Sequence, residues 1–138
     1  MTAKQTRTAD ETAIRKVLKG VYEAWNANDA DAFVADYTDD ASAILPGSYR
    51  KSREEIRESM QAGFSTFLKG STTTDEVLDI RFLNDDAAVV ISETGILFPG
   101  ETEVPQDRVV IASWVLTRQD GKWLLAAYQN SPAVMNQG

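Results

Sequence analysis

Two apolar runs separated by one polar turn make up the last third of the chain, residues 107–131. Asp120-Gly121 stands between the runs, and an Asp-Gly pair flanked by β-formers is a strong signal for a hairpin. Nearly every residue of the runs is apolar, so we expect both faces of the hairpin to be covered. The second run ends on the amides of Gln129 and Asn130. Because buried amides need hydrogen-bond partners, a ligand cavity at this strand end is a natural hypothesis.

Apolar residues at helical spacing predict a first helix near the N-terminus. Thr8 and Glu11 form a capping-box pattern at its expected start. The apolar stripe that follows comprises Ile14, Val17, Leu18, Val21, Tyr22 and Trp25. A short second helix is expected to begin at a cap on Asn28 or Asp29 and to bury Phe33.

Residues 41–45 read as a short strand, and Ser52 with Glu55 forms a second capping box that opens a third helix. The expected buried stripe of this helix is Ile56, Met60, Gly63, Phe64 and Phe67. After residue 71 the apolar period changes to two, with Leu78, Ile80 and Phe82 on one face of a strand. Turns at residues 84–86 and 99–101 divide the remainder into further strands.

Helices followed by a four-stranded antiparallel meander predict an α+β domain with the helices packed on one face of a curved sheet. We expect a single domain over residues 9–133, with flexible tails at residues 1–8 and 134–138. A chain of 138 residues with 43% hydrophobic residues is long enough to bury one core.

Composition restricts the chemistry more than the fold. The chain has no cysteine and no histidine, which excludes disulfides, thiolate chemistry, Ser-His-Asp triads and zinc sites that need imidazole. The net charge of −7 argues against nucleic-acid binding, which depends on Lys and Arg neutralising phosphates. No segment has the apolar length of a membrane span or a signal peptide. We therefore expect a cytoplasmic protein with no cofactor, no metal and no membrane or nucleic-acid partner.

Glu93 is the candidate catalytic residue. Pairing across the Pro99-Gly100 turn would bring it opposite Asp107 or Arg108, on a face shared with apolar side chains. A buried carboxyl there would have a raised pKa and could act as a general acid or base on an enolisable substrate. The alternative interpretation is a cross-strand ion pair at the sheet surface or at a dimer interface.

Several short motifs, in their order, resemble nuclear-transport-factor-2-like domains. The segment AWNANDADA at residues 24–32 is similar to the opening motif of that family. The triplet DDA at residues 39–41 and the segment REEI at residues 53–56 match the two steps that follow. GKWL at residues 121–124, with the two amides, resembles the terminal hairpin. The match is closest to the SnoaL-like branch, particularly its SgcJ/EcaC-type members.

The resemblance implies a cone, in which three N-terminal helices pack on a strongly curved, mostly antiparallel sheet around an apolar pocket, commonly in a homodimer. It also implies a role in antibiotic biosynthesis of the enediyne polyketide type, with a polyketide-derived ligand and other biosynthetic enzymes as partners. Several catalytic relatives use a pocket-facing Asp or His, whereas the last strand of this chain offers amides. Arg108 is followed by two valines, which excludes the Arg-x-Asp pattern of the epoxide hydrolases.

Candidate ligand-binding residues are the aromatic and polar side chains expected at the pocket or its mouth: Trp25, Tyr37, Tyr49, Phe64, Arg108, Gln129 and Asn130. Three functions stay open. The first is a binding module for a hydrophobic small molecule, and the second is a SnoaL-type cyclase, isomerase or dehydratase that uses Glu93 or Asp36. The third is a structural dimerisation module whose pocket is filled by its own side chains. The missing histidine and the amides favour the binding module.

Overall fold

The computed structural model describes residues 3–134, with side chains from residue 7 onward. In chain order its elements are α1 (Ala3–Asn26), α2 (Ala30–Phe33), β1 (Tyr37–Leu45), β2 (Ser48–Arg50), α3 (Arg53–Phe64), β3 (Thr72–Asn84), β4 (Ala87–Leu97), the 3-10 helix η1 (Gln106–Arg108), β5 (Val110–Gln119) and β6 (Lys122–Pro132). Among these residues no helix is long and apolar enough to cross a membrane.

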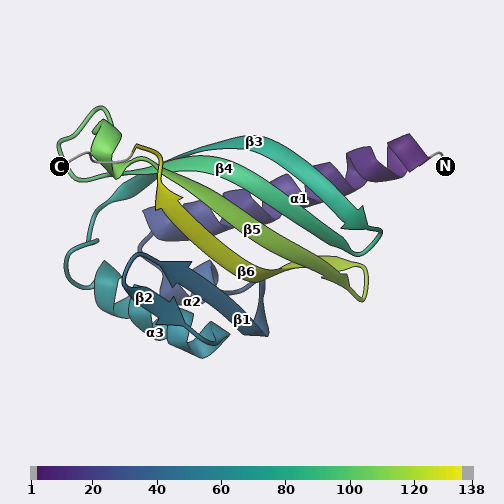
Figure 1. Cartoon of the computed structure of the whole chain (residues 1–138). Coiled ribbons are helices and arrows are strands. Elements are labelled where there is room, and N and C mark those ends of the chain that lie inside the picture. Colours follow the sequence, from purple (N-terminus) through teal and green to yellow (C-terminus); the bar gives the residue numbers. More distant parts are fainter. Residues whose placement is uncertain (1–2, 135–138) are drawn as a thin grey trace.

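Within residues 3–134, six strands form one curved, mixed sheet in the order β2-β1-β6-β5-β4-β3. The predicted antiparallel meander from β3 to β6 is confirmed. β1 joins it parallel to β6, and the three-residue β2, which the sequence analysis missed, forms the other edge. α1 runs across one face of the sheet, and α2 and α3 lie beside β1 and β2 (Figure 1). The α+β class is confirmed.

The β5-β6 hairpin has the predicted two-residue turn. Asp120 and Gly121 both have positive φ, 53° and 78°, as a type I′ turn requires. The prediction that both faces are covered is wrong for the single chain. Trp114 and its neighbours Ala112 and Leu116 are buried against the core, whereas the outward-facing Ser113 is exposed.

α1 begins earlier than its capping-box pattern predicted. Thr8 lies inside the helix, and its carbonyl accepts a hydrogen bond from the Thr12 hydroxyl. The expected N-cap is therefore wrong, because residues 3–7 have sufficient helix propensity to extend the helix. The expected tails at residues 1–8 and 134–138 stay a prediction. Residues 1, 2 and 135–138 lie outside the described residues, and α1 includes residues 3–8.

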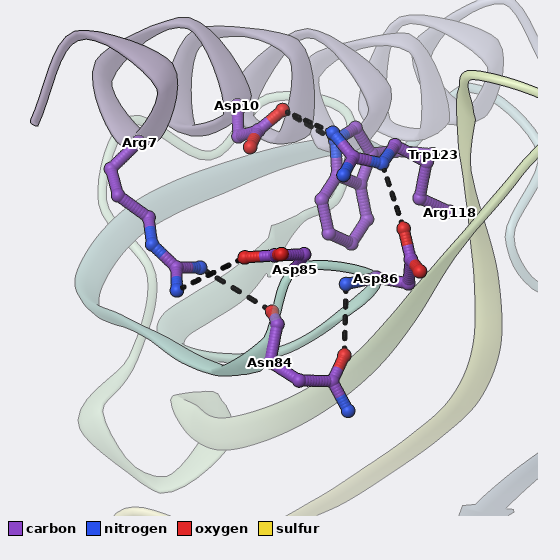
Figure 2. Close-up of polar contacts among 7 residues, drawn as sticks. All are labelled: Arg7, Asp10, Asn84, Asp85, Asp86, Arg118 and Trp123. Atoms are coloured by element: carbon purple, nitrogen blue, oxygen red, sulfur yellow. Dashed lines mark hydrogen bonds and ion pairs between the residues drawn. The ribbon is translucent and has the colours of Figure 1, made fainter. Parts of the chain in front are cut away.

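A polar cluster anchors α1 to the turns of the sheet (Figure 2). The Asp10 carboxylate accepts hydrogen bonds from Arg118 Nη1 at 3.1 Å and from Trp123 Nε1 at 3.3 Å. Arg118 also donates to Asp86 at 3.0 Å, and Arg7 donates to the Asn84 carbonyl at 3.3 Å. The cluster holds the N-terminal half of α1 against the β3-β4 and β5-β6 turns. The C-terminal half of α1 packs over the other end of these strands.

Both later helix caps are confirmed, since Asp29 accepts from the Ala32 amide and Ser52 from the Glu55 amide. Two predicted core positions are wrong. α3 ends at Phe64, so Phe67 lies in the following turns and is 73% exposed. In β3 a bulge between residues 77 and 79 shifts the alternation, which leaves Leu78 half-exposed.

Candidate functional site

A cavity of about 120 Å³ lies between α1, α2, α3 and the sheet. α1 contributes Val21, Tyr22 and Trp25, and Trp25 shares a helix face with the other two because it follows Tyr22 by three residues and Val21 by four. The other apolar and aromatic side chains of the lining are Phe33, Tyr37, Ala43, Leu45, Ile56, Met60, Ile96, Val110, Trp114 and Tyr128. The lining is thus mainly apolar and aromatic, as is typical of small-molecule sites.

Aromatic side chains form two groups around the cavity. Trp114 and Tyr128 are paired across β5 and β6, and their ring centroids are 4.4 Å apart. Trp25 and Phe33 form the second group, with their centroids 6.1 Å apart. The cavity therefore has aromatic rings of the sheet in its lining as well as aromatic rings of α1 and α2.

Three tyrosines line the cavity: Tyr22, Tyr37 and Tyr128. Burial raises the pKa of all three hydroxyls, and for Tyr22 the negative charge of Asp75 raises it further. The Tyr22 hydroxyl lies 3.1 Å from Thr94 Oγ1, which itself donates to Asp75 at 2.8 Å. These hydroxyls are therefore protonated at neutral pH and act as hydrogen-bond groups rather than bases.

Arg50 contributes a positive charge to the wall of the cavity. It forms no ion pair with any described residue. Its Nη1 donates to the thioether of Met60 at 3.5 Å, a weak acceptor, and its Nε is buried without a partner. Burial lowers the pKa of the guanidinium, but an arginine stays charged at neutral pH. The chain therefore keeps an uncompensated cation beside apolar rings.

Asn130 contributes a second unsatisfied polar atom. Its Nδ2 donates to the Tyr128 hydroxyl at 2.8 Å, while its Oδ1 is buried without a partner in the described part of the chain. Buried polar atoms normally find partners in the protein, in ordered water or in a ligand. The same cavity thus contains one free donor, on Arg50, and one free acceptor, on Asn130.

Arg108 also lines the cavity, but its charge is paired. Its two terminal nitrogens both bind the Glu101 carboxylate, and Nη1 also donates to the Ile96 carbonyl at 2.9 Å. Hydrogen bonds from the Arg108 guanidinium lower the pKa of Glu101 to about 2. This clamp closes the loop between β4 and β5, so Arg108 is a structural part of the cavity wall.

Four of the predicted ligand-binding residues line the cavity: Trp25, Tyr37, Arg108 and Asn130. Phe64 is buried behind Trp25, with ring centroids 5.6 Å apart. Tyr49 is 62% exposed, and Gln129 is exposed on the outer side of β6, so neither lines the cavity. The ligand-binding roles themselves stay predictions.

Glu93 is exposed on the outer face of β4, between the buried Ser92 and Thr94. The predicted pairing with Asp107 or Arg108 is wrong, because Glu93 lies opposite Ile111 and the other two belong to η1. The connection between β4 and β5 is a long loop rather than a tight turn, which changes the register. This position removes the geometric basis for a catalytic Glu93.

Asp36 also lies outside the cavity, where it forms an ion pair with Lys122 at 3.0 Å. Among residues 3–134 no carboxylate lines the cavity, and no group of three or more His, Cys, Asp or Glu side chains could hold a metal ion.

Arg50 was the most important residue that the sequence analysis missed. The sequence feature that could have indicated Arg50 is the Pro46-Gly47 turn between two short extended segments. A two-residue turn pairs Ala43 with Arg50, so an inward Ala43 requires an inward Arg50. The exposed Ile44 and Tyr49 form the matching outward pair.

The SnoaL-like domain family matches residues 14–135. The chain belongs to this family. SnoaL-like domains are members of the nuclear-transport-factor-2-like superfamily, so this part of the resemblance is confirmed. No curated protein matches the sequence.

Solved structures of similar proteins agree with the fold of this SnoaL-like domain. A domain of unknown function with a cystatin-like fold from Nostoc punctiforme is 31% identical, with a TM-score of 0.86 over 93% of this chain and 80% of that one. A ketosteroid isomerase-like protein from Erwinia carotovora atroseptica is 22% identical, with a TM-score of 0.68 over 90% and 96%. A hexachlorocyclohexane dehydrochlorinase from Novosphingobium barchaimii is 13% identical, with a TM-score of 0.77 over 97% and 93%. The last two show the fold alone.

Proposed function

We propose that this SnoaL-like domain binds a small hydrophobic molecule in its internal cavity and acts as a binding module. One observation carries the proposal: the cavity is lined by aromatic and aliphatic side chains, and no carboxylate of the described residues faces it. Nuclear-transport-factor-2-like domains commonly bind small molecules or act as isomerases and dehydratases.

The alternative is a SnoaL-type cyclase, isomerase or dehydratase, which needs a group that removes a proton from carbon. The chain has no histidine, and the three cavity tyrosines have raised pKa values that disfavour the basic phenolate. The site can therefore orient a ligand through hydrogen bonds but offers no side chain suited to general-base catalysis at neutral pH.

The polyketide part of the prediction stays a proposal. A cavity of about 120 Å³ takes a ligand the size of one ring, which is smaller than an enediyne intermediate. A small polyketide-derived ring compound fits this volume better than a long polyene. A role in antibiotic biosynthesis, other biosynthetic enzymes as partners and a cytoplasmic location likewise stay predictions from the sequence.

Filling the cavity should abolish binding. Ala43 is buried with its side chain in the cavity lining, so Ala43→Leu puts three further carbon atoms into the space that a ligand would occupy. We expect the affinity for a neutral one-ring probe, benzamide, to fall by about tenfold or more, measured by calorimetry and by the fluorescence of Trp25 and Trp114. The matched control is Ala62→Leu, the same change on the exposed face of α3. Equal affinity in both variants would contradict binding in this cavity.

We also propose that the chain forms a homodimer through the outer face of its sheet. Val89, Ile91, Ile111 and Val115 are half-buried there, on the side away from the core. Apolar side chains on a sheet face are typical of interfaces between subunits. Light scattering after gel filtration should give twice the chain mass, and Val115→Asp should give the monomer mass. A monomeric wild-type protein would contradict the proposal.

A further inference from the structure

The cavity combines two features that an apolar ligand alone does not explain. Arg50 Nε and Asn130 Oδ1 are both buried, both belong to residues that line the cavity, and neither has a partner among the described residues. Arg50 is half-buried, and a partly buried charge without a counter-ion costs stability because its desolvation is not offset by an opposite charge. A molecule bound in the cavity can supply the missing partners of both atoms.

We propose that the ligand is a carboxylate on a single six-membered ring, with its anionic oxygens bound by Arg50 and a hydroxyl or amine proton donated to Asn130 Oδ1. This inference rests on the proposed binding function and specifies its ligand class. The ring lies among the aromatic walls, and the head group meets Arg50, the one unpaired cation that the described residues place in the cavity lining. The ligand thereby gives both unsatisfied polar atoms a hydrogen-bond partner.

Charge decides between an anionic and a neutral head group. Arg108, the other guanidinium in the wall, is already bound by Glu101, so it does not compete for the ligand. The cavity lining therefore carries one unbalanced positive charge, although the whole chain has a net charge of −7. A guanidinium binds a carboxylate through short charge-assisted hydrogen bonds, whereas a neutral amide leaves the charge uncompensated. Hydroxyls of Tyr37 and Tyr128 can add donors at the same wall.

Volume decides the size of the ligand. A dry apolar cavity of about 150 Å³ takes one benzene molecule, so the 120 Å³ here limits the ligand to at most one six-membered ring in this space. Trp25 and Phe33 on one side and Trp114 and Tyr128 on the other present ring faces and edges to such a ligand. A fused ring system or a long chain exceeds this space.

Benzoate and benzamide are the matched probes, since they have nearly the same shape and differ in charge. We expect wild-type protein to bind benzoate about 10- to 100-fold more tightly than benzamide, the range typical of charge-assisted hydrogen bonds. Arg50→Met should remove this preference and keep the affinity for benzamide. The control Arg81→Met makes the same change in net charge at an exposed position of β3 outside the cavity, and should keep the preference.

Thermal unfolding gives an independent measurement. Without ligand, Arg50→Met should unfold at the same temperature as wild type or higher, because an apolar side chain replaces a half-buried charge that has no counter-ion. Benzoate should raise the unfolding temperature of wild type and of Arg81→Met, but not that of Arg50→Met. If Arg50→Met does not fold, the ratio of the wild-type affinities for benzoate and benzamide tests the proposal instead. Arg50→Lys is then the second variant, and it should retain part of the preference for benzoate.

The outcomes separate the ligand class from the binding function. Equal affinities of wild-type protein for benzoate and benzamide would overturn the carboxylate proposal and leave the binding module standing. A preference that survives Arg50→Met would also overturn it. No binding of either probe would overturn both proposals.

A hydroxyl on the ring tests the role of Asn130. Of the 2-, 3- and 4-hydroxybenzoate isomers, at least one should bind about 2- to 10-fold more tightly than benzoate, as expected for one hydrogen bond to a buried acceptor. Asn130→Ala should remove that gain and retain the preference for benzoate over benzamide. No gain for any isomer would overturn the assignment of Asn130 as the acceptor.

Discussion

Trp114→Ala should lower the free energy of unfolding by about 3–5 kcal/mol, as is usual for removing a large aromatic side chain from a core. Trp114 is 2% exposed, its ring pairs with Tyr128, and its Nε1 donates to Ser92 at 3.0 Å. Trp114 both lines the cavity and belongs to the buried core. Urea denaturation followed by circular dichroism measures the loss without depending on tryptophan fluorescence.

Trp114→Phe separates the ring from the hydrogen bond. The phenyl ring keeps much of the packing against Tyr128, while Ser92 loses the donor to its buried hydroxyl. An unsatisfied buried group costs about 1–3 kcal/mol, so this variant should fall between wild type and Trp114→Ala. A loss below about 1 kcal/mol in Trp114→Ala would contradict the packing described for β5 and β6.

Phe33→Ala should also cost about 3–5 kcal/mol and should enlarge the cavity. Phe33 lies on the one-turn α2, where it packs against Trp25, Tyr37 and Phe64 with centroid distances of 6.1, 6.0 and 6.3 Å. A helix of four residues has no stability of its own, so α2 depends on the burial of Phe33 and Ala30. The expected functional result is a relaxed size limit, which binding of naphthoate relative to benzoate measures.

Phe67→Ala is the matched control, because it removes the same side chain from an exposed position. Phe67 is 73% exposed beyond the end of α3, so its truncation should change the unfolding free energy by less than about 0.5 kcal/mol. Equal losses at Phe33 and Phe67 would show that the aromatic cluster around the cavity is not the anchor of α2.

Local sequence signals predicted turns and helix caps correctly where the backbone conformation depends on a few neighbouring residues. The Asp120-Gly121 turn and the caps at Asp29 and Ser52 were found because each depends on one side chain and its near neighbours. The α+β class followed from the order of these elements. The predictions at Leu78 and Phe67 were wrong because a bulge and an early helix end are decided by packing between elements.

The candidate site depended more strongly on tertiary structure. Glu93 was placed opposite Asp107 or Arg108 by assuming a tight turn, but the loop before β5 is long and the carboxylate faces outward. One step of register moves a strand residue from the cavity to the surface, so no local pattern could decide this point. The same rule separates Asn130, which lines the cavity, from its exposed neighbour Gln129.

The sequence by itself determined the order of the α-helices and of the strands other than β2, the meander and its hairpin turn, the absence of histidine and cysteine chemistry, and the family resemblance. These depend on composition and on contacts between near neighbours. Only the tertiary structure brought Arg50 and Asn130 to one cavity and left each with an unsatisfied polar atom. These residues are far apart in the chain, and their proximity follows from the parallel pairing of β1 with β6, which long-range packing decides.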